Sequence, residues 1–140
     1  MRVIRDVVEA FNRRDVERAL ERLSEDVEFD WSRRMIDAEV THGHEGFRRF
    51  AEQATELFEE VYLDEPEEIL EVGDDIVVVS VARFRGRTSG VDVAARSATV
   101  WTVEGGEVTR FRFFQTKEDA LEYLRAERAA QGRAADGDGG

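Results

Sequence analysis

Four strand patterns follow one another in the second half of the sequence, with turns between them and no helical pattern. β-Branched and aromatic residues dominate the segments 62–72, 76–84, 91–103 and 108–115, and glycine-containing turns separate them. Consecutive strands joined by short turns pair antiparallel, whereas parallel neighbours need a crossover of a dozen or more residues. The segments therefore predict an antiparallel meander, with 76–84 at its centre because it is apolar on both faces. Pro66 cannot donate to a ladder, so we expect 62–72 at an edge or with a bulge.

Helical patterns are prominent in the first 61 residues. Apolar residues at spacings of three and four predict helices over 3–11 and 16–23, and a longer helix over 47–61. Between the second and third of these, strict alternation over 27–31 predicts a half-buried strand. The polar residues 32–46 that follow it are predicted to form a loop.

A short helix is predicted to end the folded part of the chain. Thr116, with Asp119 three residues later, has the pattern of a helix start. Strands that follow one another without alternating helices are typical of an α+β domain, here expected over residues 1–127. The Gly-, Ala- and Asp-rich residues 128–140 are predicted to be disordered. A bent antiparallel sheet wrapped on three helices would enclose an apolar cavity.

The charge balance excludes two classes of partner. Lys and Arg number 20 against 32 Asp and Glu, so the net charge is -12 with neutral histidines. A field of this sign repels phosphate backbones and anionic lipid, which argues against nucleic-acid binding and membrane-surface binding. The chain has no cysteine and no apolar run near the roughly 20 residues that span a bilayer. Its first residues lack the pattern of a signal peptide, so we expect a cytoplasmic protein.

Four short motifs carry a resemblance to a known family. They are residues 9–15 (EAFNRRD), 43–47 (GHEGF), 99–102 (TVWT) and 117–121 (KEDAL). With them, the chain over residues 3–125 resembles the ketosteroid-isomerase-like, SnoaL-like branch of the nuclear-transport-factor-two superfamily. The resemblance implies a cone-shaped, cystatin-like α+β barrel with a highly curved antiparallel or mixed sheet wrapped around three N-terminal helices, an apolar pocket, and a homodimer through the sheet. The superfamily contains isomerases, cyclases, epoxide hydrolases and non-catalytic binding modules, so fold alone does not give the function.

The family chemistries fit this sequence unequally. The isomerase general base corresponds to Asp30, but the two oxyanion donors fall on Val7 and near Thr99, and one missing donor costs a factor of about a hundred or more in rate. Epoxide hydrolysis needs two Asp bridged by Arg, whereas residues 76–84 contain no acid and the last-strand position is Phe113. A cyclase would need a carboxylate or His on the sheet, and the interior strands carry no His.

Asp30 is the one catalytic candidate that the resemblance leaves. In a pocket lined by Phe29, Trp31 and Met35, desolvation would raise the pKa of its carboxyl toward that of a useful base. Strand alternation gives the opposite interpretation, because it turns Asp30 outward when Val27, Phe29 and Trp31 face the core.

Pocket walls and core are expected to be continuous in this fold, so the candidate ligand-binding residues are mostly aromatic. Arg83 could hold a ligand carboxylate, or could pair with residues 56–75, which contain ten acids and no base. The full predicted lining is Phe11, Asn12, Phe29, Trp31, Met35, Phe50, Phe58, Arg83, Ser97, Thr99, Trp101, Phe111, Phe113 and Gln115.

Two hypotheses for the function follow from the sequence. The first is a domain that binds a small, mostly apolar organic molecule and acts on it as an isomerase, cyclase or hydrolase with Asp30 as acid or base. The second is a non-catalytic ligand-binding or dimerisation module. No cofactor or metal is predicted, because His42 and His44 are read as solvated loop histidines rather than ligands. Outward Arg110 and Arg112 predict a partly polar dimer interface.

Overall fold

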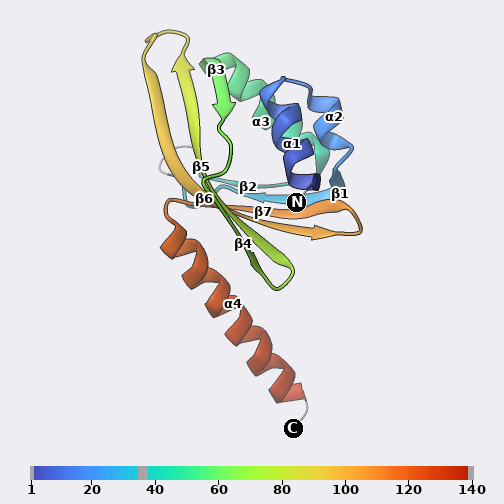
Figure 1. Cartoon of the computed structure of the whole chain (residues 1–140). Helices are drawn as coiled ribbons and strands as arrows, with labels where there is room; N and C mark the ends of the chain where they lie inside the picture. Colours follow the sequence, from blue (N-terminus) through green and yellow to red (C-terminus); the bar gives the residue numbers. More distant parts are fainter. Residues whose placement is uncertain (1, 35–37, 139–140) are drawn as a thin grey trace.

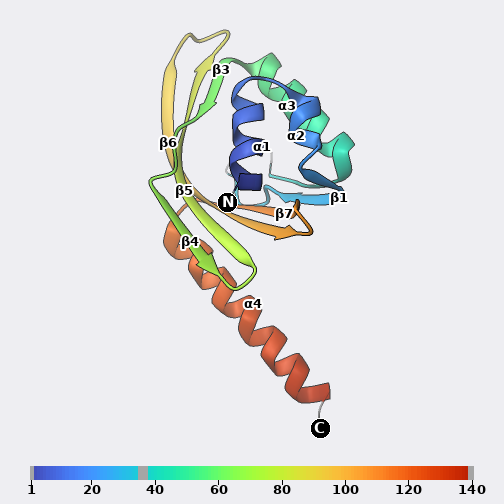
Figure 2. The same ribbon diagram turned by 45° about the vertical axis from the view of Figure 1, so that its right-hand side comes forward.

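A curled mixed sheet forms the body of the molecule, with three helices on its concave side and one on its convex side (Figure 1, Figure 2). The computed structural model describes residues 2–34 and 38–138, with side chains as far as residue 132. In chain order the elements are α1 (Arg2–Asn12), α2 (Val16–Leu20), β1 (Leu23–Asp30), β2 (Val40–His42), α3 (Gly43–Leu57), β3 (Phe58–Leu63), β4 (Glu68–Val72), β5 (Asp75–Gly86), β6 (Asp92–Glu104), β7 (Glu107–Phe114) and α4 (Lys117–Asp138).

The meander predicted from the sequence is confirmed by the pairing of β5, β6 and β7. The strand order is β2-β1-β7-β6-β5-β3, with β4 beside β5, and every pair is antiparallel except β1 with β7. The long β5 runs through the middle, as its apolar faces predicted, and pairs with β6 along almost its whole length. This arrangement is the curved α+β fold that the resemblance implied.

The predicted single strand over residues 62–72 is in fact two strands on the same side of β5. β3 pairs with residues 82–86 of β5, and β4 pairs with residues 75–79 of the same strand. The residues between β3 and β4 include Pro66. Backbone hydrogen bonds from Asp64 to Val81 and from Glu67 to Val79 hold this interruption against β5. A proline at an interrupted edge of the sheet is what the missing donor predicted.

The third helix begins and ends four residues earlier than its periodicity predicted. Phe58 and Val61 follow the helical spacing, but they belong to β3, where Val61 pairs with Phe84 of β5. Tertiary strand pairing therefore decides the state of a segment that local periodicity assigns to a helix. The predicted loop also contains a short strand, β2, which leads into α3 through Gly43 with a φ of +80°, a conformation that a side chain would strain.

The C-terminal helix is longer than the sequence predicted. Residues 128–138, expected to be disordered, form the last turns of α4, and the helix projects beyond the sheet (Figure 1, Figure 2). Alanine, arginine and glutamine are strong helix formers, so a composition that resembles a flexible tail also favours continuing a helix already begun. Within residues 2–34 and 38–138, every helix is too short or too polar to cross a lipid bilayer.

Two separate apolar cores lie on the two sides of the sheet. The concave core packs α1, α2 and α3 on the sheet and includes Ile4, Val7, Val27, Phe29, Phe47, Val78, Trp101 and Phe111. The convex core packs α4 on the other side and includes Val77, Val79, Val100, Phe114, Ala120 and Leu124. Neighbouring residues such as Val77 and Val78 contribute to opposite cores, because side chains alternate along a strand.

Candidate functional site

Aromatic rings cover the concave side of the sheet where it meets the helices. Trp31 is central, with ring centroids 4.8 Å from Phe50, 4.8 Å from Phe111 and 5.8 Å from Phe113. The ring of Phe111 also meets Trp101 edge-on at 4.9 Å. We call this set, with Phe29, Phe47 and Phe11, the aromatic cluster. The rings pack against one another, so they occupy much of the space in which the sequence predicted a hollow.

An open groove adjoins the aromatic cluster between α1, α2, α3 and β3. Its volume is about 460 Å³, within the range of sites that hold small organic molecules. Apolar residues form its floor: Phe11, Val16, Phe47, Ala51, Ala54 and Val61. The remaining lining residues are Thr55 and six charged residues, namely Arg14, Asp15, Glu17, Arg48, Glu52 and Glu56. We call this hollow the helix groove.

The helix groove and the aromatic cluster share two residues. Phe11 stacks on Phe50 at 6.0 Å, and Phe47 lies 5.6 Å from Phe29. Both Phe11 and Phe47 also line the groove. A molecule in the groove would therefore contact rings that continue into the cluster. Of the predicted lining, Phe11 lies at this groove, whereas Phe29, Trp31, Phe50, Trp101, Phe111 and Phe113 lie in or against the core beside it.

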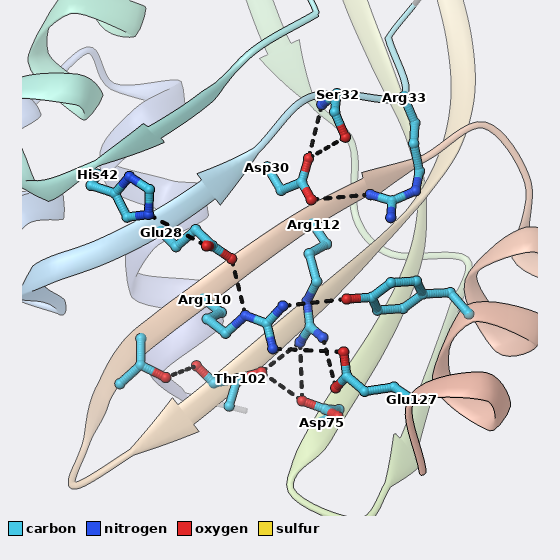
Figure 3. A network of polar contacts seen from close by, with 12 residues as sticks. Glu28, Asp30, Ser32, Arg33, His42, Asp75, Thr102, Arg110, Arg112 and Glu127 are labelled. Atoms are coloured by element: carbon cyan, nitrogen blue, oxygen red, sulfur yellow. Dashed lines mark hydrogen bonds and ion pairs between the residues drawn. The ribbon is translucent and has the colours of Figure 1, made fainter. Parts of the chain in front are cut away.

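Asp30 lies on the opposite side of the sheet from the aromatic cluster. At the register where β1 meets β7, Phe29 lies beside Phe111 and Asp30 beside Arg112. The Asp30 carboxylate accepts hydrogen bonds from the Ser32 amide at 2.9 Å, the Ser32 hydroxyl at 2.5 Å and the Arg33 guanidinium at 3.2 Å (Figure 3). The Asp30 side chain therefore points away from the aromatic cluster, as strand alternation predicted. It does not point into a pocket, as the general base of the isomerases would.

The electrostatics of Asp30 are those of an ordinary charged carboxylate. Burial by itself raises the pKa of this group, since its side chain is only 16% exposed, but the hydrogen bonds from Ser32 and the charge of Arg33 outweigh it. The net result is a pKa below the usual aspartate value. A general base that works near neutral pH needs its pKa moved in the other direction.

A polar network lies beneath α4 on the convex side of β7 (Figure 3). Arg112 is completely buried and donates to the Thr102 hydroxyl at 2.5 Å, Asp75 at 3.1 Å and Glu127 of α4 at 3.4 Å. Arg110 donates to Glu28 at 3.1 Å and also lies 3.7 Å from Glu127. We call this set the convex network.

Sequence reasoning predicted the direction of Arg110 and Arg112 but not that Arg112 is completely buried and Arg110 partly covered. Alternation along the last strand placed both outward, where a dimer interface was expected. In this chain its own helix α4 covers them, with the Tyr123 hydroxyl 3.3 Å from Arg110. The signal that could have revealed this cover is the apolar side of the C-terminal helix, which had no assigned partner in the sequence.

Several predicted polar contacts bond to the protein itself. The Asn12 side chain donates to the Leu63 carbonyl at 3.0 Å and accepts from the Leu63 amide at 2.8 Å, so it continues the sheet at the edge of β3. The Thr99 hydroxyl accepts from the Trp101 indole at 2.8 Å. Gln115 donates to the Arg33 carbonyl at 3.1 Å. These bonds give each side chain a structural role.

The other predicted residues are dispersed over the sheet. Arg83 pairs with Asp64 at 2.9 Å, inside the acidic stretch with which pairing was expected. Phe58 packs on Phe84 at 5.3 Å, away from the aromatic cluster. Ser97 is half-buried opposite Ser80 on the strand pair β5 and β6. Met35 lies outside the described residues.

The two histidines have different partners. His44 Nε2 lies 2.9 Å from the Leu23 carbonyl, and His42 Nε2 lies 3.4 Å from Glu28. His44 is therefore partly buried and bonded, not the solvated loop histidine that the sequence suggested, and it belongs to α3. Across the described part of the chain, no three His, Asp or Glu side chains are gathered in a way that could hold a metal ion.

Comparison with known proteins gives one family and one fold. The model of the SnoaL-like domain matches residues 4–111. Among solved structures, an NTF2-like protein of unknown function from Burkholderia pseudomallei is 25% identical, with a TM-score of 0.70 over 87% of this chain and 94% of that one. TerC, co-crystallised with polyporic acid, is 22% identical, with a TM-score of 0.71 over 86% of this chain and 94% of that one.

Other similar structures extend the same result. A protein from Xanthomonas campestris described as a candidate polyketide cyclase is 18% identical, with a TM-score of 0.70 over 86% of this chain and 92% of that one. Two more similar structures are described as having a cystatin or cystatin-like fold. At these identities the likeness is one of fold. No curated protein matches the chain.

Proposed function

Since the chain belongs to the SnoaL-like domain family, we propose that it binds a small, mostly apolar organic molecule and does not transform it. The helix groove is the proposed site. Its floor is apolar, its volume of about 460 Å³ suits one small molecule, and its phenylalanines continue into the aromatic cluster. Burial of apolar ligand surface against this floor would supply the binding free energy.

One observation supports a binding protein over an enzyme. Asp30, the acid or base that the resemblance supplied, lies across the sheet from the aromatic cluster and has a lowered pKa. Both of its oxygens are already hydrogen-bonded, to Ser32 and Arg33. A general base must reach the proton it removes, so this carboxylate has neither the position nor the basicity for the reaction.

Titration with Nile red, an uncharged apolar dye, tests binding at the groove. Ala54→Trp would place an indole in the groove, and we expect it to weaken dye binding by about tenfold or more, because it occupies the ligand's volume. Ala129→Trp is the matched control, since Ala129 is exposed on α4. Equal dye affinity in both variants would reject the groove as the site.

Native mass spectrometry of protein purified from its own host tests the absence of catalysis. We expect a single small molecule to co-purify, to be released unchanged, and to be lost from Ala54→Trp. If purified protein converted the recovered molecule into a product, and Asp30→Asn abolished the conversion, the enzymatic hypothesis would replace the present one. Conversion that survives Asp30→Asn would point to a catalytic group other than Asp30.

The predicted homodimer remains a proposal, and α4 limits where it could form. This helix covers the convex side of the sheet over Val77, Val100 and Phe114. Among the described residues, α4 does not cover the outward side of β3, of residues 82–86 of β5 or of residues 92–95 of β6. This surface carries exposed Tyr62 beside paired charges such as Arg83. A dimer through the sheet would use this surface. Sedimentation as a monomer at micromolar concentration would exclude it.

A further inference from the structure

The charges around the helix groove are unevenly balanced. Four carboxylates line it (Asp15, Glu17, Glu52 and Glu56), against two guanidinium groups (Arg14 and Arg48). The residues that line the groove therefore carry two more negative than positive charges. The apolar floor has a low dielectric constant, which focuses the field of the surrounding charges into the groove.

Both arginines of the groove are already engaged by the protein. Arg48 forms an ion pair with Glu17 and lies 3.6 Å from Glu45, and the hydrogen bond that Arg48 donates to Glu17 is the main cause that raises the pKa of Arg48 above its usual value. Arg14 donates to the backbone carbonyl of Glu59. A ligand carboxylate would have to displace these partners, so the groove offers an anion little.

Two glutamates at the groove carry negative charges that no salt bridge among the described side chains compensates. Glu52 and Glu56 are both exposed and lie one turn apart on α3. Among the described side chains, neither glutamate is within salt-bridge distance of a basic group. Like charges four residues apart on a helix repel each other, so a cation placed between them would relieve that repulsion as well as gain attraction.

Resting on the proposed function, we propose that the helix groove prefers apolar molecules that carry a positive charge. The apolar body lies on Phe11 and Phe47, and a protonated or quaternary amine lies beside Glu52 and Glu56. The groove itself supplies most of the affinity, and the two glutamates decide between ligands of equal apolar surface. A carboxylate-bearing ligand of the same size is rejected by the same charges.

Three compounds with one apolar body test this preference. Calorimetric titration would compare 2-(1-naphthyl)ethylamine, the neutral 1-naphthaleneethanol and 1-naphthylacetate at 50 mM and 500 mM NaCl. We expect the amine to bind about three- to fivefold more tightly than the alcohol at low salt, as exposed ion pairs allow, and the acetate to bind most weakly. Raising the salt should reduce the preference, because the charges lie near solvent.

A matched pair of double variants locates the effect. Glu52→Gln with Glu56→Gln should remove the preference for the amine, so the ratio of the amine affinity to the alcohol affinity falls to about one. Glu118→Gln with Glu122→Gln makes the same charge change at the same spacing on α4, and it should retain the preference. A preference that persists without Glu52 and Glu56, or that disappears in the α4 variant, would overturn the assignment to these residues.

The outcomes separate this inference from the proposed function. If none of the three naphthyl compounds binds, while Nile red is also not bound, the groove is not a ligand site and both proposals fail. If all three bind equally, or the acetate binds most tightly, the groove remains a site for apolar molecules and only its preference for cations is refuted.

Discussion

Both faces of β7 pack against helices, but charged side chains are prominent on one face only. On the concave face Phe111 and Phe113 meet the aromatic cluster, and on the convex face Arg110 and Arg112 meet acids and Tyr123. Helices cover both faces, α1 to α3 on one and α4 on the other. The same strand thus contributes to one core that is held by apolar contact alone and to another in which directed charges lie beside apolar residues such as Phe114.

Aromatic packing and charged hydrogen bonding differ in how strictly they fix the positions of the side chains. Aromatic rings gain from contact over a range of angles, and ring pairs in the cluster are stacked, tilted and edge-on. A buried guanidinium needs a partner for each N–H, and Nε of Arg112 has none among the described residues. The concave face should therefore tolerate conservative changes in shape, whereas the convex face should be sensitive to any change in charge.

The largest effect is expected on the concave face. Phe111→Ala removes a ring that contacts Phe29, Trp31 and Trp101, so the free energy of unfolding should fall by about 3–5 kcal/mol. Phe111→Leu, which retains much of the volume, should cost clearly less. Urea unfolding followed by circular dichroism measures both variants. A loss below about 1 kcal/mol for Phe111→Ala would mean that the cluster does not form a packed core.

Removing the buried charge of Arg112 on the convex face should lower the free energy of unfolding by about 3 kcal/mol, at the lower end of the range for breaking a buried ion pair. Arg112→Met keeps an unbranched apolar stem but removes the guanidinium group, so Asp75 and Glu127 lose this partner. These carboxylates are 17% and 23% exposed, so water compensates part of the loss.

A triple variant separates the lost charge from the lost packing. Adding Asp75→Asn and Glu127→Gln to Arg112→Met removes the unpaired charges, so we expect it to restore much of the stability measured by urea unfolding. A triple variant no more stable than Arg112→Met would show that the lost packing of the arginine, rather than the unpaired charges, accounts for the destabilisation.

Much of the fold could be predicted from sequence because alternation and turns are local signals. The meander, the central position of 76–84 and the edge position of the segment that contains Pro66 all follow from residue order. The errors occur where a distant partner decides the local state. Phe58 and Val61 have helical spacing but pair with β5, and α4 extends through residues whose composition suggested disorder.

The candidate site was less predictable, because it depends on which side of the sheet each residue faces and on what covers that side. The sequence favoured both directions for Asp30, and only the pairing of Phe29 with Phe111 decides between them. Most of the predicted aromatic residues pack together, although Phe58 does not, and their spacing could not distinguish a lined cavity from a packed cluster. The helix groove involves α1, α2, α3 and β3 together, so no local pattern predicts it.

Glu127→Gln tests how firmly the convex network holds α4. This residue lies near both Arg110 and Arg112, but it is partly exposed, so we expect a loss of about 1 kcal/mol. The loss should appear as faster amide hydrogen exchange in α4, with little change in β7. Glu122→Gln is the control, since Glu122 is exposed on the same helix. Equal exchange in the two variants would show that apolar contacts alone hold α4.

The smallest change in the free energy of unfolding is expected for Asp30→Asn. The pH dependence of this change also tests which face of the sheet Asp30 lies on. Because the folded-state pKa of Asp30 is lowered, its charge stabilises the protein above the pKa of the unfolded state, and this contribution disappears as the pH falls through the folded pKa. We expect Asp30→Asn to be destabilised by about 1 kcal/mol or less at pH 6, with the difference from wild type closing below about pH 4.

A carboxylate on the concave face would give the opposite sign. Surrounded by aromatic rings, its pKa would be raised, and Asn would be more stable than Asp at neutral pH because it removes a desolvated charge. Urea unfolding of wild type and Asp30→Asn between pH 3 and pH 7 therefore distinguishes the two faces by the direction of the change alone. Stabilisation by Asp30→Asn at pH 7 would return Asp30 to the pocket side and reopen a catalytic role.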